Sequence, residues 1–166
     1  MKDAESWINQ LNLTAHPEGG YFRETYRSDE SIPKDSLPAR YDDDRKYVTQ
    51  ILFLLKSCDF SSFHKLESDE TWHFIYGNPL EIIEILPSGH LRKTLLGHNI
   101  FDGQSLQYTV KRGNWFAARP LENNGFTVCA CSVAPGFEFT DFFLARKEQL
   151  LELFPQHQNI IFQLTR

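Results

Sequence analysis

The sequence predicts an all-β fold, a closed barrel or a two-sheet jelly roll, with one short helix towards each end of the chain. Aromatic residues make up 14% of its 166 residues, 14 of them phenylalanine, which favours broad β-surfaces over a helical bundle. Between residues 47 and 133, short apolar or alternating runs follow one another between turn residues, with no helical period among them. A single domain over residues 1–166 is expected.

The predicted N-terminal helix covers residues 3–13. Trp7, Ile8 and Leu11 recur at helical spacing, and Asp3 can cap the first turn. We expect this short amphipathic helix to lie against the outside of the β-structure.

A turn and a strand follow the helix. Residues 16–20, His-Pro-Glu-Gly-Gly, predict the turn, and residues 21–27 alternate in the manner of a strand. Phe22, Glu24 and Tyr26 share one face of that strand. Because aromatic residues lie on both faces, we expect the strand to be pressed between two surfaces.

The remaining elements are predicted from alternation and turn signals. A polar loop precedes the strands and a helix follows them, and the last segment is either a closing strand or an extended tail. The loop covers 28–44, the strands 47–55, 59–66, 71–76, 80–86, 91–96, 104–110, 114–119 and 126–133, the helix 146–154 and the last segment 157–164.

The composition narrows the classes of partner and compartment. A formal net charge of -5 and the lack of a basic cluster argue against nucleic-acid binding. No apolar run reaches transmembrane length, and the first residues are charged where a signal peptide would be apolar, so a cytoplasmic protein without a membrane partner is expected. The three cysteines, Cys58, Cys129 and Cys131, are expected to be reduced, and the last two are interpreted as small buried hydrophobes rather than metal ligands.

Residues 61–77 concentrate the polar groups that would serve a pocket. Alternation places His64 on one face of its strand, and Glu70 and Trp72 together on one face of the next. A histidine and a carboxylate that meet inside a barrel can bind a metal or act as an acid–base pair. The alternative is that His64 only hydrogen-bonds a neighbour in a polar seam, with His73 on the outer face.

Two spacings in the chain resemble the motifs of the cupin superfamily. His64, Glu70 and Gly77 resemble the first motif, which is His-x-His, three or four residues, Glu, six residues and Gly. Residues 110–116 resemble the second motif, a glycine turn followed three residues later by histidine. The resemblance implies a double-stranded β-helix, or jelly-roll, barrel with a ligand inside it.

The chain departs from both motifs at the metal ligands. Leu66 stands where the family has its second metal-binding histidine, and Phe116 stands where it has its third. Neither side chain can donate a lone pair, so no bound metal and no cofactor are expected.

Residues 16–27, 68–74 and 133–139 are similar to the uncharacterised cupin-5 branch, over about residues 16–145. Residues 20–24 are also similar to a strand of the dTDP-4-dehydrorhamnose 3,5-epimerases. That resemblance implies that Phe22 and Glu24 face the sugar nucleotide and that the strand crosses to a second subunit, hence a homodimer.

By the same resemblance His64 matches the general base of the epimerases. Their catalytic lysine has no counterpart here, and Gly19 and Ser61 stand where they carry arginines. The expected function is therefore a small-molecule-binding cupin, a metal-free isomerase or epimerase of a carbohydrate-like or sugar-nucleotide substrate, with His64 taking a proton next to a carbonyl. The alternatives are a non-catalytic ligand-binding or sensor module and a metal-dependent cupin enzyme.

The expected site residues fall into two groups. The catalytic residues are His64, Glu70 and Asp141, where Asp141 would orient His64 as the acid of a dyad. The ligand-binding residues are Phe22, Glu24, Tyr26, Trp72 and Phe116.

Overall fold

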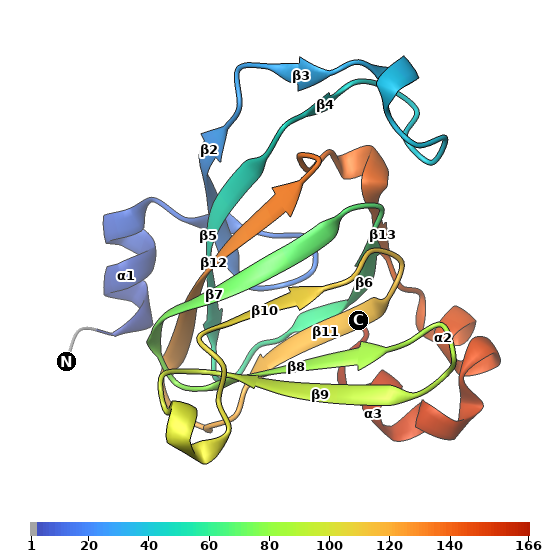
Figure 1. The fold of residues 1–166 in the computed structure, drawn as a ribbon. Helices are drawn as coiled ribbons and strands as arrows, with labels where there is room; N and C mark the ends of the chain where they lie inside the picture. Colours follow the sequence, from blue (N-terminus) through green and yellow to red (C-terminus); the bar gives the residue numbers. More distant parts are fainter. Residues whose placement is uncertain (1–2) are drawn as a thin grey trace.

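The structure is a computed structural model that describes residues 3–166 as two antiparallel sheets facing each other. The predicted all-β jelly-roll barrel is confirmed. Figure 1 shows the two sheets wrapped around a common interior, with α1 on one flank and α2 and α3 on another.

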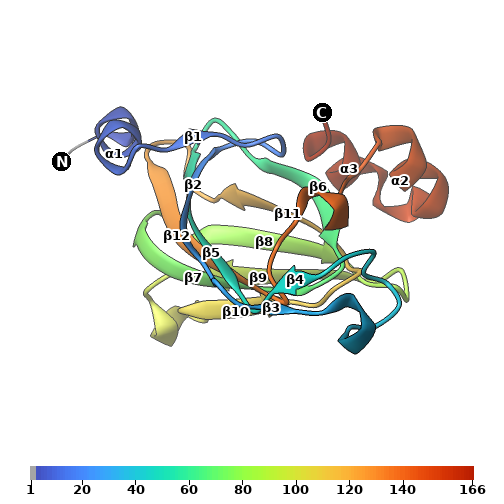
Figure 2. The same cartoon turned by 90° about the horizontal axis from the view of Figure 1, so that it is seen from above.

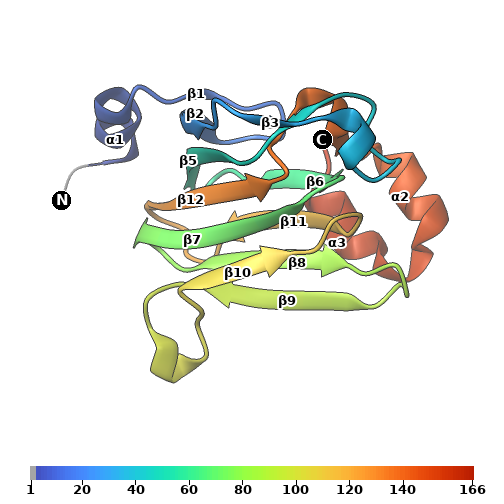
Figure 3. The same cartoon turned by 45° about the horizontal axis from the view of Figure 1, so that its top comes forward.

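The larger sheet has six strands and the smaller one five. The order in the larger sheet is β1 (Thr14–Ala15), β2 (Tyr21–Arg27), β5 (Thr49–Lys56), β12 (Phe126–Ala134), β7 (Asp69–Gly77) and β10 (Gln107–Val110). The order in the smaller sheet is β13 (Phe142–Leu144), β6 (Ser61–Leu66), β11 (Trp115–Pro120), β8 (Leu80–Ile85) and β9 (Leu91–Leu96). Figure 3 shows β5, β12, β7 and β10 following one another across the larger sheet.

The other elements lie outside the barrel walls. The helices are α1 (Ala4–Leu11), α2 (Lys147–Leu153) and α3 (Gln158–Gln163); a two-stranded ribbon joins β3 (Ser31–Ile32) to β4 (Arg45–Lys46); and four 3₁₀ turns are η1 (Lys34–Ser36), η2 (Ile100–Asp102), η3 (Phe139–Asp141) and η4 (Pro155–His157). Within residues 3–166, no helix is both long enough and apolar enough to cross a membrane. Figure 2 shows α1 and the α2–α3 pair on opposite flanks.

Strand alternation divides the apolar residues into three packed layers. The central layer fills the space between the sheets and includes Phe53, Trp72 and Cys131. The five-stranded sheet packs its other face against α2 and α3, and the six-stranded sheet packs its outer face against α1. On β6, Phe63 therefore faces the helices and His64 faces the barrel interior.

The chain after residue 154 differs from the sequence prediction. A closing strand or extended tail was expected over 157–164, whereas the structure forms η4 and α3 there. Ile161 and Leu164 are buried with Leu150 of α2 against the smaller sheet. Spacing by three residues puts Ile161 and Leu164 on one side of a helical turn, whereas strand alternation would separate them.

Candidate functional site

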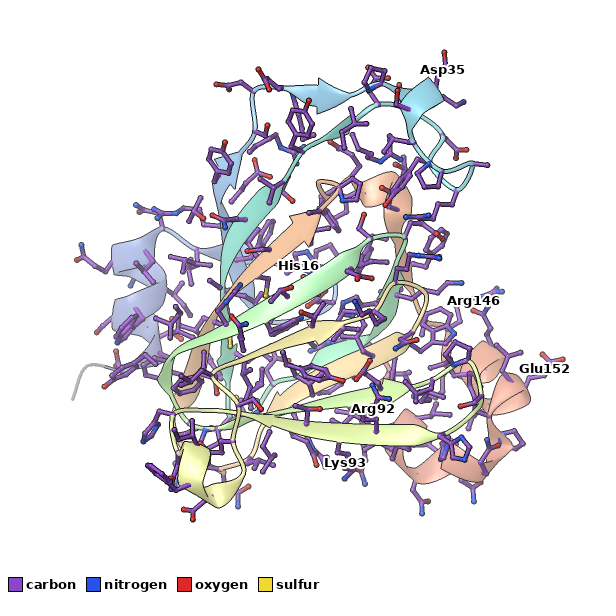
Figure 4. All side chains as sticks on the ribbon, viewed as in Figure 1. His16, Asp35, Arg92, Lys93, Arg146 and Glu152 are labelled. Atoms are coloured by element: carbon purple, nitrogen blue, oxygen red, sulfur yellow. The ribbon has the colours of Figure 1, made fainter. Side chains whose placement is uncertain are left out.

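A pocket opens into the barrel between the two sheets. Its volume is about 690 Å³ when the open mouth is included. The lining combines ionisable side chains with aromatic rings and a few aliphatic groups: His16, Glu18, Phe22, Glu24, Arg27, Thr49, Ile51, Phe53, His64, Leu66, Glu70, Trp72, Cys131, Val133, Phe137, Glu138, Phe139 and Phe142. Figure 4 shows His16 within the body of the barrel, whereas Asp35 and Glu152 lie on its periphery.

The turn before β2 carries Glu18 into the pocket. Gly19 follows with φ of 114°, and a Cβ there would lie 2.2 Å from the carbonyl oxygen of Phe60, so only glycine fits. The backbone N–H of Ser62 donates to the carbonyl oxygen of Glu18 at 2.8 Å. The turn is thereby fixed against the start of β6, the strand that supplies His64.

Arg166 reinforces this junction from outside the pocket. Its guanidinium donates to the carbonyl oxygen of Glu18 and, at 2.7 Å, to the hydroxyl of Ser62. It also pairs with the carboxylate of Asp59, which accepts the backbone N–H of Gly20 at 2.9 Å. Arg166 therefore holds Glu18 directly, and Gly20 through Asp59, against the start of β6.

Glu18 forms the centre of a buried polar cluster. Its Oε2 lies 3.4 Å from Nε2 of His64 and 3.4 Å from Nδ1 of His16, while its Oε1 accepts the hydroxyl of Ser61 at 2.7 Å. Glu18 and His64 are 6% and 2% exposed, so water contributes little to solvating them.

The other hydrogen bonds of His64 and His16 indicate which nitrogen of each ring carries a proton when the ring is neutral. Nδ1 of His64 lies 2.8 Å from the carbonyl oxygen of Ser62, which can only accept, so Nδ1 carries a proton. Nδ1 of His16 accepts the backbone N–H of Glu18 at 3.3 Å. With both rings neutral, Oε2 of Glu18 therefore faces two lone pairs. One proton shared by Glu18 and a ring nitrogen removes that repulsion.

Burial favours the uncharged form of each member of this cluster. It raises the pKa of the Glu18 carboxyl, against the opposing influence of His16, Ser61 and Arg166. It lowers the pKa of His64, although Glu70 and the bond to Ser62 oppose the change. It also lowers the pKa of His16. Burial therefore disfavours full charge separation between the Glu18 carboxyl and either histidine ring.

Glu70 faces the same cavity from β7. Its Oε2 accepts Nε1–H of Trp72 at 2.9 Å. Burial raises the pKa of Glu70 to about 7, with His64 and the Trp72 bond acting in the opposite direction and Glu18 in the same direction. Near neutral pH, Glu70 is therefore present both as carboxylate and as carboxylic acid. Burial, with Glu70 adding to it, also raises the pKa of the neighbouring Cys131, so this thiol is neutral.

The mouth of the pocket holds a charged triplet. Arg27 donates to both carboxylate oxygens of Glu24, at 2.9 to 3.1 Å, and to Oε1 of Glu138 at 2.6 Å. These three side chains are about one-third to two-fifths exposed, so they lie where a ligand would enter.

A β-bulge decides which residues of β2 reach the pocket. Glu24 pairs with Ile51, but Tyr26 pairs with Gln50, so Thr25 is an extra residue in the ladder. The bulge reverses the alternation after Glu24. Arg27 therefore lines the pocket, and Tyr26, expected there, lies outside the lining and is 50% exposed.

The structure brings together five of the eight residues proposed from the sequence. His64, Glu70, Phe22, Glu24 and Trp72 all line the pocket. Phe116 instead packs against the ring of His64, with 4.0 Å between the centroids, and is buried behind the lining.

Asp141 lies elsewhere. Both of its carboxylate oxygens accept from Arg45, at 2.6 and 2.7 Å, and the pair is buried. Both ring nitrogens of His64 already face Ser62 and Glu18. Asp141 therefore does not orient His64 as expected, because it forms an ion pair with Arg45 outside the pocket lining. The carboxylate that lies next to His64 is that of Glu18.

Four acidic or basic residues of the lining were not predicted: His16, Glu18, Arg27 and Glu138. The signal for Glu18 is its place in a His-Pro-Glu-Gly-Gly turn directly before a strand with ligand-facing residues. Arg27 and Glu138 gave no comparable signal, because a bulge and a loop place them.

The side chains around His64 do not fit the metal site of a standard cupin. Leu66 lines the pocket where a histidine ligand would lie, and Phe116 covers one face of His64. Across residues 3–166, no three His, Cys, Asp or Glu side chains are grouped so as to hold a metal ion.

Comparison with known families gives one match that covers most of the chain. The family model described as "Cupin superfamily (DUF985)" matches residues 5–145. A yeast relative, uncharacterized protein YML079W of Saccharomyces cerevisiae, is 28% identical over 157 residues, which cover 88% of this chain and 77% of the relative.

Two solved structures are similar to this chain over nearly its whole length. Protein SO0799 from Shewanella oneidensis superposes with a TM-score of 0.90 at 36% identity, covering 100% of this chain and 99% of that one. A hypothetical protein from Leishmania major gives 0.89 at 35% identity, covering 99% of each chain. Oxalate decarboxylase from Bacillus subtilis gives 0.55 at 16% identity over 90% of this chain and 36% of its own, a likeness of fold alone.

Proposed function

Because the chain belongs to the cupin superfamily (DUF985), we propose that its barrel pocket binds a small hydroxycarbonyl compound of carbohydrate type and isomerises or epimerises it by metal-free proton transfer. The observation that supports this most directly is the convergence of two proton-exchanging units on one cavity. Glu70 is one unit, and the Glu18–His64 pair is the other. An acid and a base that are both available near neutral pH are what enolisation requires.

The proposed reaction starts with the carboxylate of Glu70. In residues 3–166 only Trp72 donates to this carboxylate, through Oε2, and no fully enclosed side-chain polar atom lacks a partner. Oε1 is therefore reached from the cavity, where it takes the proton from the carbon next to the carbonyl. The proton shared by Glu18 and His64 passes to the carbonyl oxygen, and an enediol forms.

Return of the protons completes the reaction. Glu70 gives its proton to the neighbouring carbon for isomerisation. For epimerisation the enediol first turns over in the cavity, so that Glu70 returns the proton to the opposite face of the same carbon. A hydroxyl of the enediol gives its proton back to the Glu18–His64 pair, so atoms and electrons balance. This assignment moves the base from His64, the residue expected from the sequence, to Glu70, because Nε2 of His64 faces Glu18.

Solvent hydrogen exchange tests the proposal. The protein is incubated in D₂O with a panel of aldoses, ketoses and keto-sugars, and NMR follows deuterium at the carbon next to the carbonyl. We expect the wild type to introduce deuterium into at least one compound. Glu70→Gln should lower the exchange rate by about a hundredfold or more. Exchange that persists at the wild-type rate in Glu70→Gln would remove Glu70 from the reaction.

A second candidate is a ligand-binding module without turnover. It is supported by the aromatic character of the pocket wall, since rings of Phe22, Phe53, Phe137, Phe139 and Phe142 surround the polar groups. Ligand binding that survives in His64→Ala, with no exchange by the wild type across the whole panel, would favour this candidate.

We also propose a homodimer built on the outer edge of β2. Within residues 3–166, β1 pairs with that edge only at Tyr21 and Phe22. The other edge of β2 pairs along its length with β5 of the same chain, so the sheet does not need strand exchange. An exposed strand edge is a template for a second strand. Light scattering that gives the mass of one chain at micromolar concentration would contradict the dimer.

A further inference from the structure

The charge in the pocket is strongly one-sided. Four carboxylates line it, Glu18 and Glu70 in the interior and Glu24 and Glu138 at the mouth, against one guanidinium, that of Arg27. Arg27 already donates to both mouth carboxylates. An incoming phosphate or carboxylate would have to displace one of them. Even with a proton on each interior glutamate, the mouth carboxylates outnumber Arg27.

One of the two interior carboxylates, that of Glu70, has an oxygen that accepts no hydrogen bond from residues 3–166. Glu70 is 7% exposed, and Oε2 is its only oxygen that accepts a hydrogen bond from the described residues. Its free Oε1 is directed to the cavity. A buried oxygen with free lone pairs is suited to a donor on a ligand, and a charged donor gains most.

The aromatic side chains of the pocket wall also favour a bound cation. Phe137, Phe139 and Phe142 form a cluster in which ring centroids lie 5.1 to 6.2 Å apart, and His16 and Phe22 extend it towards the interior. Phe139 is 56% exposed at the mouth. Aromatic faces attract ammonium groups through their quadrupole. Rings and carboxylates together thus favour a positively charged organic group.

We propose that the pocket selects a small hydroxylated organic cation, such as an amino sugar or another amino alcohol, over phosphorylated or nucleotide-linked sugars. This inference rests on the proposed function, because it names the substrate class of the same cavity. The ammonium group of a substrate lies between the aromatic wall and the mouth carboxylates, and the free oxygen of Glu70 faces the carbon next to the carbonyl; choline has no carbonyl, so its ammonium group can also approach Glu70. The hydroxyl and carbonyl groups face Glu18 and His64.

A matched series of probes tests the charge preference by isothermal titration calorimetry. The probes are choline, the uncharged alcohol in which carbon replaces the quaternary nitrogen, and the carboxylate with the same carbon skeleton. We expect choline to bind in the millimolar range or tighter, and about tenfold more tightly than the alcohol. The carboxylate should bind more weakly than either. Equal or stronger binding of the carboxylate, or no binding of choline, would overturn the inference.

Two pocket variants should change choline affinity in opposite directions. Glu70→Gln should weaken choline binding by about tenfold and leave the alcohol within about twofold. Arg27→Gln should strengthen choline binding, because it removes the only arginine or lysine side chain that lines the pocket within residues 3–166. Weaker choline binding in Arg27→Gln, at an unchanged melting temperature, would contradict the inference. Glu152→Gln is the matched control, because Glu152 is an exposed carboxylate on α2 (Figure 4) and is not part of the pocket lining.

The two proposals fail separately. Deuterium exchange on a neutral or anionic sugar, with no preference for choline over its alcohol, would overturn the charge selection and leave the isomerase standing. Preference for choline with no exchange on any panel compound, amino sugars included, would support the charge selection and overturn the isomerase.

Discussion

Oε2 of Glu18 lies 3.4 Å from Nε2 of His64, inside a barrel where both side chains are almost completely buried. The other nitrogen of His64 is committed to the carbonyl oxygen of Ser62. A proton on either of the two facing atoms replaces two opposed lone pairs with a favourable contact, and loss of that proton would leave a buried carboxylate on Glu18.

Glu18→Gln removes this exchangeable proton while keeping the shape of the side chain. We expect deuterium exchange in the hydroxycarbonyl panel to fall by about a hundredfold, as for loss of an acid–base group. The amide can still accept the hydroxyl of Ser61, which now contacts Oε1. The fold should therefore persist, which circular dichroism checks. Exchange by Glu18→Gln at the wild-type rate would show that Glu18 is not part of the proton path.

The raised pKa of Glu70, about 7, makes stability depend on pH in a defined direction. The folded protein holds this proton above pH 4.5, the ordinary pKa of a glutamate, where the unfolded chain has lost it. The contribution of Glu70 is therefore fully present below 4.5 and is lost as pH rises through about 7. The shift corresponds to about 3 kcal/mol of unfolding free energy.

Urea unfolding of wild type and Glu70→Gln at about pH 5 and about pH 8 measures this contribution. The pKa of Glu18 is also raised, whereas those of His16 and His64 are lowered, so the histidines change stability with pH in the opposite direction. The difference between the two proteins isolates Glu70. Glu70→Gln should lose less stability than wild type on going to the higher pH. An equal loss in both proteins would contradict the raised pKa.

Much of the fold follows from local signals in the sequence. The alternating runs between turn residues suffice to predict the strands, because side chains of a strand point to opposite faces in turn and one face of each sheet is buried. The same alternation places Phe22, Glu24, Glu70 and Trp72 correctly in the pocket. It fails after Thr25, because a bulge inserts an unpaired residue without changing the residue types around it.

The rest of the site depends on contacts between distant segments. Glu18 belongs to the pocket because its turn is bonded to Ser62 and Arg166, more than forty residues further along the chain. The periodicity of residues within one segment of the sequence cannot predict those hydrogen bonds. Asp141 shows the reverse case: it follows a loop near the barrel end, but Arg45 is close enough to hold it in an ion pair.

Arg166 should act as a positioning residue for Glu18. Arg166→Gln removes the bonds to the carbonyl oxygen of Glu18 and the hydroxyl of Ser62 together with the ion pair to Asp59. We expect a loss of about 1 to 3 kcal/mol in urea unfolding. The guanidinium also lowers the pKa of Glu18, so its removal should move the pH profile of deuterium exchange to higher pH.

Arg166→Lys keeps the charge but not the forked geometry. It should restore the pH profile more fully than the stability. A merely structural role for Arg166 would give lower stability with no movement of the pH profile, measured at a temperature where both variants are folded.

Asp141→Asn tests the separation between the ion pair and the pocket. It leaves Arg45 buried without a counter-ion, because both nitrogens that now donate to Asp141 lose a charged partner. Breaking a buried pair from one side costs about 3 to 5 kcal/mol, so the melting temperature should fall clearly. At a temperature where the variant is folded, choline affinity and deuterium exchange should remain within about twofold of wild type. A hundredfold loss of exchange in folded Asp141→Asn would return Asp141 to the catalytic group, since its ion pair contacts no atom of the proposed proton path.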